Sequence, residues 1–146
     1  MHFITGGAFN GKRKWVKNFY AADRHLWLSA YEADALTNSS DGELPAVVVL
    51  EGLEKWIYKQ IDTAFPPDTT RQNVMNQIEP WLEWEKADSY RRLVIIGTDI
   101  SKGIVPVDKR ERLWRDVTAW VYQDLTARAK RADVIWYGME QTLKDE

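Results

Sequence analysis

The sequence predicts an α/β fold in which a mostly parallel central sheet of about five or more strands is flanked by helices. Five short apolar runs, three of them rich in Val and Ile, are typical of strands buried on both faces. Helical patterns separate most of these runs, as crossover connections between parallel strands require. A length of 146 residues fits one domain, covering residues 1–146. The runs span residues 2–5, 25–30, 46–50, 93–96 and 133–137.

Four helices are expected between the runs. The first begins near Gly11, the second follows Gly52 and ends at Pro66-Pro67, and the third covers about residues 70–86. The fourth begins at Asp108, with Glu111 three residues on in a variant of the capping box. Each carries an apolar stripe at helical spacing. Residues 38–42, Asn-Ser-Ser-Asp-Gly, are the strongest loop signal and form a connection within the domain.

Composition excludes several classes of function. The chain has no cysteine, which rules out disulfides and thiolate chemistry, and its two histidines lie far apart in the sequence. A net charge of −2 gives no sign of a nucleic-acid binder. The longest apolar run, residues 46–50, is too short to span a membrane, and no secretory signal is present, so we expect a cytoplasmic protein.

Tryptophan is unusually frequent, with eight residues of this type in the chain. The ordinary interpretation is that they are aromatic residues of the core and of interfaces. The alternative is that a few of them form a wall for a large flat ligand. Position in the sequence alone does not separate the two.

The first strand runs into a glycine-rich loop of the form G-x-x-x-x-G-K, with Gly6, Gly11 and Lys12 at its fixed positions. Such loops wrap backbone N–H groups around phosphate and deliver it to the N-terminus of the following helix. Lys12 would reach the β- and γ-phosphates. The hydroxyl that normally holds Mg²⁺ is replaced by Arg13. The alternative is a glycine-rich turn that contains a lysine by chance.

Two further stretches follow the C-terminal tips of predicted strands, where open α/β sheets bind ligands. Glu51 ends the buried run 46–50 and is a candidate for holding Mg²⁺, or else a capping or surface acid. The stretch 97–116 follows the run 93–96 and brings glycine and proline together with two arginines suited to clamping phosphate. Its candidate residues are Gly103, Pro106, Arg112 and Arg115, of which Arg115 equally suits a solvated helix face.

Together these stretches resemble the adenosylcobinamide kinase and adenosylcobinamide-phosphate guanylyltransferase family of cobalamin biosynthesis. The front loop is similar to that family's GGARSGKS, and the frame of Glu51, Leu53 and Trp56 is similar to its acid, leucine and tryptophan. The most specific match is the stretch 101–106, SKGIVP, followed by Arg112, Arg115-Asp116 and Gln123. Residues 132–134 continue the likeness into the last run. The matching front loop consists of Gly6, Gly7, Ala8, Phe9, Asn10, Gly11, Lys12 and Arg13.

The resemblance implies a P-loop NTPase-like domain that transfers phosphate from ATP or GTP to the aminopropanol hydroxyl of adenosylcobinamide and then attaches GMP through a histidine. It implies a homo-oligomer, a propeller-like trimer, and a corrinoid partner. By the same resemblance Lys12 stabilises the transferring phosphate and Glu51 supports the metal. Arg112 belongs near the phosphate or the corrinoid side.

Two departures from the family pattern modify this expectation. The family carries its histidine in a segment after the strand 25–30, but no histidine follows His25 in this chain. We therefore expect kinase rather than guanylyltransferase activity, with a non-catalytic nucleotide- or corrinoid-binding relative as the alternative. Since a guanidinium has no acceptor, Arg13 predicts a loop that binds phosphate but holds Mg²⁺ weakly. Arg13 would point away from the phosphates or touch them itself. A scaffold that binds only proteins is the third interpretation.

Overall fold

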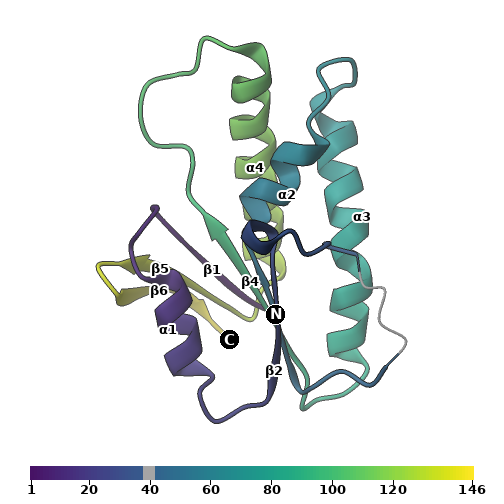
Figure 1. Cartoon of the computed structure of the whole chain (residues 1–146), viewed down its shortest axis with the longest axis vertical. Helices are drawn as coiled ribbons and strands as arrows, with labels where there is room; N and C mark the ends of the chain where they lie inside the picture. Colours follow the sequence, from purple (N-terminus) through teal and green to yellow (C-terminus); the bar gives the residue numbers. More distant parts are fainter. Residues whose placement is uncertain (38–41) are drawn as a thin grey trace.

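The computed structural model describes residues 1–37 and 42–146, and six strands form its central sheet. Their order is β2-β3-β4-β1-β5-β6, with β1 to β5 parallel and β6 antiparallel to β5. This confirms the predicted α/β class, and Figure 1 shows the helices flanking the sheet. Residues 38–41 of the predicted loop lie outside the described residues. The strands are β1 His2–Gly6, β2 His25–Ser29, β3 Val47–Glu51, β4 Arg92–Thr98, β5 Arg131–Trp136 and β6 Met139–Asp145.

All five predicted strands are present, with ends that differ by no more than two residues. The sixth strand, β6, has no counterpart in the prediction. Its sequence MEQTLKD is exposed along nearly its whole length, because β6 is an edge strand that pairs only with β5. A strand solvated on both faces needs no apolar alternation, so its pattern gives no signal.

The helices are α1 Lys12–Phe19, α2 Leu53–Gln60, α3 Pro67–Lys86 and α4 Lys109–Arg128, with a short 3-10 helix, η1, at Ala30–Glu32. The prediction that Pro66-Pro67 ends the second helix was wrong. Helix α2 ends at Gln60, and Pro67 is the first residue of α3, where its fixed φ and missing N–H are tolerated. The predicted cap of α4 is confirmed, since the Asp108 carboxylate accepts from the Glu111 N–H at 3.1 Å.

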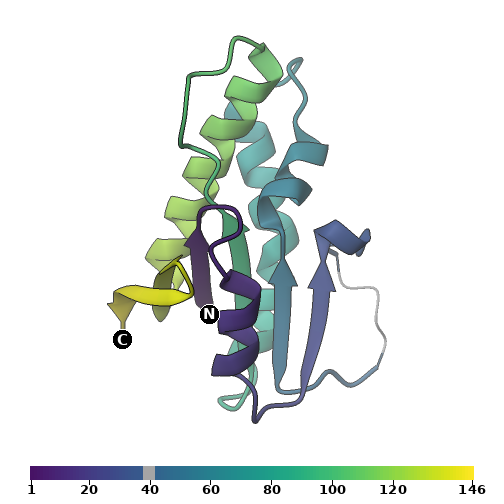
Figure 2. The same cartoon turned by 60° about the vertical axis from the view of Figure 1, so that its left-hand side comes forward.

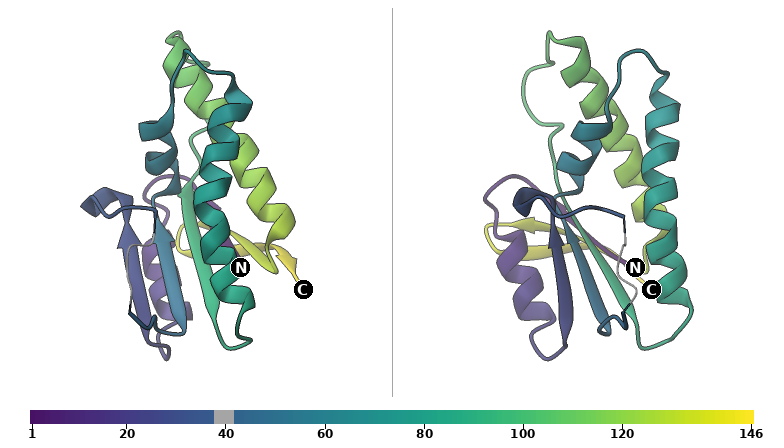
Figure 3. Two further views of the ribbon diagram at one scale, coloured as in Figure 1. Left: turned by 90° about the vertical axis from the view of Figure 1, so that its right-hand side faces the viewer. Right: turned by 45° about the vertical axis from the view of Figure 1, so that its right-hand side comes forward.

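Successive strand residues point to opposite faces of the sheet, so a continuous apolar run fills two cores. Val48 and Leu50 lie in the larger core under α2, α3 and α4, whereas Val47 and Val49 lie in the smaller core with Val16 of α1. Figures 2 and 3 show α1 alone on one side of the sheet and the other helices on the opposite side.

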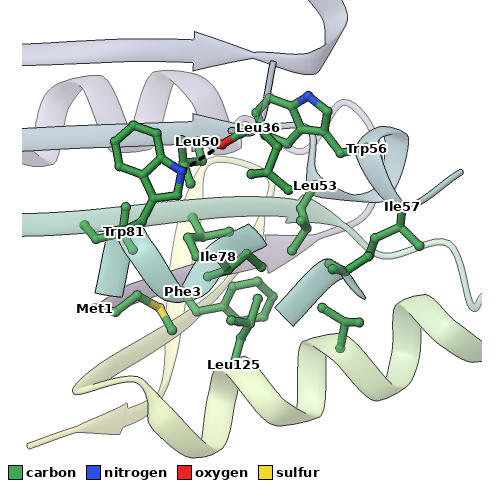
Figure 4. Packing of buried hydrophobic residues seen from close by; sticks show 14 of the residues in the cluster. Met1, Phe3, Leu36, Leu50, Leu53, Trp56, Ile57, Ile78, Trp81 and Leu125 are labelled. Atoms are coloured by element: carbon green, nitrogen blue, oxygen red, sulfur yellow. Dashed lines mark hydrogen bonds between the residues drawn. The ribbon is translucent and has the colours of Figure 1, made fainter. Parts of the chain in front are cut away.

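Two of the eight tryptophans anchor the segment after β2 onto the larger core. The Trp81 indole N–H donates to the carbonyl of Leu36 at 2.8 Å, as Figure 4 shows, and the Trp56 indole donates to the carbonyl of Asp34 at 2.9 Å. Both rings are almost fully buried. For these two residues the ordinary interpretation, core aromatics with a satisfied N–H, is confirmed.

A buried polar cluster joins β1, β5, β6 and the residue that follows α1. The two ring nitrogens of His2 lie 2.6 Å from the Tyr20 hydroxyl and 2.6 Å from Asp133 Oδ2. Asp133 also accepts from Arg131 at 2.8 Å and from the Thr142 hydroxyl at 2.7 Å. Burial lowers the pKa of His2, against the opposing effect of Asp133. The neutral ring therefore accepts from Tyr20 and donates to Asp133.

In the part of the chain that the structure describes, no helix is long and apolar enough to cross a membrane.

Candidate functional site

The carboxyl ends of four neighbouring parallel strands meet at one edge of the sheet. The register places Ser29 beside Glu51, Glu51 beside Ile96, and Gly6 beside Thr98. A cleft of 1130 Å³ lies over this edge, and side chains of α1, η1, α2 and α4 form its walls. Its lining is Ala8, Phe9, Gly11, Lys12, Arg13, Lys14, Lys17, Asn18, Tyr31, Glu51, Glu54, Lys55, Tyr58, Ile96, Thr98, Ile100, Glu111 and Trp114.

The glycine-rich loop connects β1 to α1, and two of its glycines are required by their surroundings. Gly6 has φ +142°, and a Cβ there would lie 2.5 Å from the carbonyl oxygen of Ile135. Gly11 adopts the left-handed region immediately before α1. The tip of the β5–β6 hairpin packs against the loop, where the Gly138 N–H donates to the Asn10 carbonyl at 2.9 Å. The loop is thus held by its own backbone conformation and by contacts from β5 and the β5–β6 hairpin.

Lys12 begins α1, and its side chain is only slightly exposed beside the loop. Its ammonium donates to the Gly7 carbonyl at 2.8 Å. Burial lowers the pKa of Lys12, while the nearby carboxylates of Glu54, Glu51 and Asp99 oppose that shift. A partly desolvated cation under a strand–loop–helix turn is well placed to attract an anionic group, because few water molecules screen it.

Glu51 does not face the cleft as a free carboxylate. Its Oε1 accepts from the Trp27 indole at 3.2 Å, and its Oε2 lies 3.3 Å from Nε of Arg13. Arg13 also donates from Nη2 to Glu32 at 3.1 Å, and its guanidinium lies 5.6 Å from the centre of the Trp27 ring. Two carboxylates and an indole therefore hold Arg13 at the cleft.

Glu54, in the first turn of α2, is a second buried acid that the sequence analysis did not single out. It accepts from the Tyr31 hydroxyl at 2.5 Å and from the Thr98 backbone N–H at 3.0 Å. These bonds tie η1, α2 and the end of β4 into one floor of the cleft. Burial and the bond to Glu54 raise the pKa of Tyr31, which keeps its hydroxyl protonated as the donor.

Magnesium is the metal that the front loop and the family imply, but the residues at this edge do not fit it. Both oxygens of Glu51 are engaged, one of them by the Arg13 guanidinium, which has no lone pair to offer a cation. Both oxygens of Glu54 accept hydrogen bonds. Over residues 1–37 and 42–146, no group of three or more His, Cys, Asp or Glu side chains is arranged to hold a metal ion.

The predicted site residues divide into four groups. Ala8, Phe9, Gly11, Lys12, Arg13 and Glu51 line the cleft, whereas Gly6, Gly7 and Asn10 form the loop behind it. Arg112 donates to the carbonyls of Pro106 and Val107, so it braces the loop before α4, in which Gly103 is left-handed. Arg115 pairs with Asp116 and lines a separate cavity of 170 Å³.

The far end of the cleft is aromatic. Trp114 of α4 meets Tyr58 of α2 edge to face, with ring centres 5.0 Å apart, and its indole donates to the Glu54 carbonyl at 2.8 Å. Trp114 and Tyr58 both line the cleft. The cleft therefore joins a charged end at the loop to an aromatic end between α2 and α4.

Residues 23–143 match the model of the family described as cobinamide kinase / cobinamide phosphate guanyltransferase. The chain belongs to this family. Membership assigns it to the nucleotide-binding proteins of cobalamin biosynthesis. The match includes Glu51, Glu54, the loop before α4, Arg112 and Arg115, while the glycine-rich loop precedes it. A comparison with curated proteins found no match.

The histidine expected of the family's second activity has no counterpart in this relative of the cobinamide kinases. In the described part of the stretch between β2 and β3, the only helical element is η1. His25, the last histidine in the sequence, begins β2 and lies at the edge of the sheet opposite the cleft. The cleft lining contains no histidine.

Proposed function

We propose that this protein binds ATP or GTP with the triphosphate against residues 7–12 and transfers the γ-phosphoryl group to the hydroxyl of adenosylcobinamide. The observation that carries the proposal is the buried Lys12 ammonium at a strand–glycine loop–helix turn, at one end of a cleft large enough for a nucleotide. Family membership supports the same assignment.

In this proposal each part of the cleft has a role. Lys12 and the N-terminus of α1 stabilise the charge that spreads over the transferring phosphoryl oxygens. The acceptor hydroxyl attacks the γ-phosphorus, the bond to the bridging oxygen breaks, the nucleoside diphosphate leaves, and the hydroxyl proton passes to solvent. The aromatic end, with Tyr58 and Trp114, accommodates the apolar part of the acceptor. Guanylyl transfer is absent, because no histidine lines the cleft to accept GMP.

A second candidate is a nucleotide-binding relative that does not catalyse transfer. The specific observation in its favour is the ion pair between Arg13 and Glu51, which engages the carboxylate that would support a metal. Phosphoryl transfer in P-loop enzymes relies on a metal ion to neutralise developing charge. Both candidates share the nucleotide site and differ only in turnover.

Calorimetric titration with ATP and GTP tests the shared part of the proposal. Lys12→Ala should weaken binding about ten- to hundredfold, the value of a charge-assisted contact. The matched control is Lys59→Ala, which removes an exposed lysine of α2 outside the cleft and should leave the affinity unchanged. Equal affinity of the Lys12 variant and the wild type would refute the site.

Turnover separates the two candidates. Incubation with adenosylcobinamide and γ-labelled nucleotide should transfer label to the corrinoid if the protein is a kinase, and should not if it only binds. Incubation with α-labelled GTP should give no acid-labile protein adduct. A guanylylated protein would contradict the loss of guanylyl transfer.

Assembly is a further part of the proposal. We expect a homo-oligomer, a trimer by resemblance to the family, and exposed apolar side chains on the β5–β6 hairpin and the loop before α4 are available for it. Sedimentation at micromolar concentration measures this directly. A single 17 kDa species would count against an oligomer.

A further inference from the structure

We infer that Arg13 is a resident replacement for the metal ion, so that the cleft takes the metal-free form of a nucleoside triphosphate. The inference rests on the proposed nucleotide site and specifies which charge state of the nucleotide that site recognises. The residues at this edge of the sheet do not fit a magnesium ion, and Arg13 lies beside Glu51, the acid that would support one.

The position of the Arg13 guanidinium leaves its charge open to the cleft. Arg13 and Lys12 are consecutive residues at the start of α1, and both line the cleft. The Arg13 side chain is about half exposed, at 45%, while its partner Glu51 is 7% exposed. The charge is therefore fixed by a buried carboxylate on one side and open to the cleft on the other.

Neighbouring side chains hold the Arg13 guanidinium in place. A lone arginine on a helix surface samples many rotamers, and ordering it costs free energy when a ligand binds. Here Glu51, Glu32 and the face of Trp27 contact the guanidinium from three elements, β3, η1 and β2. Preorganisation of this kind lowers the entropy lost on binding.

The Arg13 guanidinium keeps one nitrogen without an acceptor among the described residues. Nη2 donates to Glu32, and Nε lies 3.3 Å from Oε2 of Glu51. Among residues 1–37 and 42–146, none accepts a hydrogen bond from Nη1 of Arg13. A guanidinium presents donors in a planar fork that matches phosphate oxygens, so Nη1 is suited to bind an oxygen that a metal ion would otherwise coordinate.

The cations that line the cleft favour the more negatively charged form of the ligand. Arg13, Lys14 and Lys17 follow Lys12 along α1, and all four cations line the cleft. Free nucleoside triphosphate carries two more negative charges than its magnesium complex. A divalent ion brought in with the nucleotide would lie close to the Arg13 guanidinium and be repelled by it. The free polyphosphate is attracted by the four cations of α1, which outnumber the three carboxylates of Glu51, Glu54 and Glu111 in the lining.

The experiment is calorimetric titration of the full chain with ATP, once with excess Mg²⁺ and once with a chelator. The wild type should bind in the chelator at least as tightly as with Mg²⁺. Arg13→Ser, which restores a hydroxyl, should lose about ten- to hundredfold in the chelator and should regain affinity when Mg²⁺ is added. Lys86→Ser, which removes an exposed cation of α3, is the control and should behave as the wild type.

Each outcome decides the inference separately from the proposed function. Binding by the wild type that disappears on chelation would overturn the role of Arg13 and leave the nucleotide site standing. Binding under neither condition would overturn the nucleotide site itself. An Arg13→Ser variant that binds metal-free ATP as tightly as the wild type would show that Arg13 only supports Glu51. Thermal unfolding of each variant verifies that it folds.

Discussion

The buried cluster around His2 makes a prediction about stability in mild acid. Burial lowers the pKa of His2 from its ordinary value of 6.5, so the folded protein keeps this ring neutral where the unfolded chain takes up a proton. Below pH 6.5 the unfolded state therefore binds more protons, and stability falls as the pH drops toward the lowered pKa. At one pH unit below 6.5 the loss is about 1.4 kcal/mol if the folded ring stays neutral.

Burial is the main cause of this shift, and Arg131 adds to it. Its guanidinium donates to Asp133 at 2.8 Å and already neutralises that carboxylate, so His2 is not needed as a second cation. Were the pair instead His⁺ with Asp⁻, the pKa of His2 would rise on folding, and stability would increase as the pH falls from that raised pKa to the ordinary value of 6.5. The two arrangements predict opposite slopes of stability against pH.

Urea unfolding at about pH 7.5 and about pH 5.5 measures the slope. His2→Gln removes the titrating ring and should reduce the difference between the two pH values by about 1.4 kcal/mol, whatever it does to absolute stability. The amino group of Met1, whose pKa burial also lowers, should keep its own part of the difference. His25→Gln is the matched control, because His25 is the other histidine and lies exposed at the start of β2, and it should retain the wild-type difference. Wild-type stability that rises toward pH 5.5 would refute a neutral, buried His2.

Three other predictions follow from single contacts. Gly6→Ala should lower the free energy of unfolding by at least about 2 kcal/mol and weaken nucleotide binding, because the new Cβ would clash with the Ile135 carbonyl. Calorimetry measures the stability, and titration measures the binding. An unaltered variant would mean that the loop relaxes freely. Thr118→Val should leave stability unchanged or raise it by about 1 kcal/mol, because the Thr118 hydroxyl is buried without a partner among the described residues; a clear loss in urea unfolding would reveal an ordered water at that hydroxyl. Asp133→Asn should reduce the loss of stability below pH 3.8. Burial would raise the pKa of Asp133, but hydrogen bonds from Arg131, Thr142 and His2 outweigh burial and lower that pKa. Acid unfolding that keeps its wild-type steepness would contradict this prediction.

The sequence was sufficient to predict the fold class, the five parallel strands and the position of the glycine-rich loop. These features depend on local patterns, namely apolar runs, helical spacing and glycine at fixed positions. The boundary of α2 was missed because Pro66-Pro67 suits either the end of one helix or the start of the next. The strand β6 was missed because it is an edge strand, exposed along nearly its whole length, and so has no apolar alternation.

The site was harder to predict because its contacts join distant segments. Glu54 occupies an ordinary position in the first turn of α2, and its role arises only where the η1 segment and the end of β4 meet it. The pairing of Arg13 with Glu51 had a signal, an extra cation beside the loop and an acid at a strand tip. The sheet order decides whether they meet, since β4 separates β1 from β3 and the length of the arginine side chain bridges the gap.

The position of β1 in the sheet has a consequence for how the chain acquires its shape during synthesis. Residues 2–6 emerge from the ribosome early, yet both neighbours of β1 in the sheet, β4 and β5, come from residues 92–98 and 131–136. The loop at residues 6–11 is complete only when Gly138 has been synthesised and its N–H donates to the carbonyl of Asn10. Contacts of such wide sequence separation form late. A nascent chain that stops before residue 138 would thus contain the segments of all four α-helices but lack the contact that closes the glycine-rich loop.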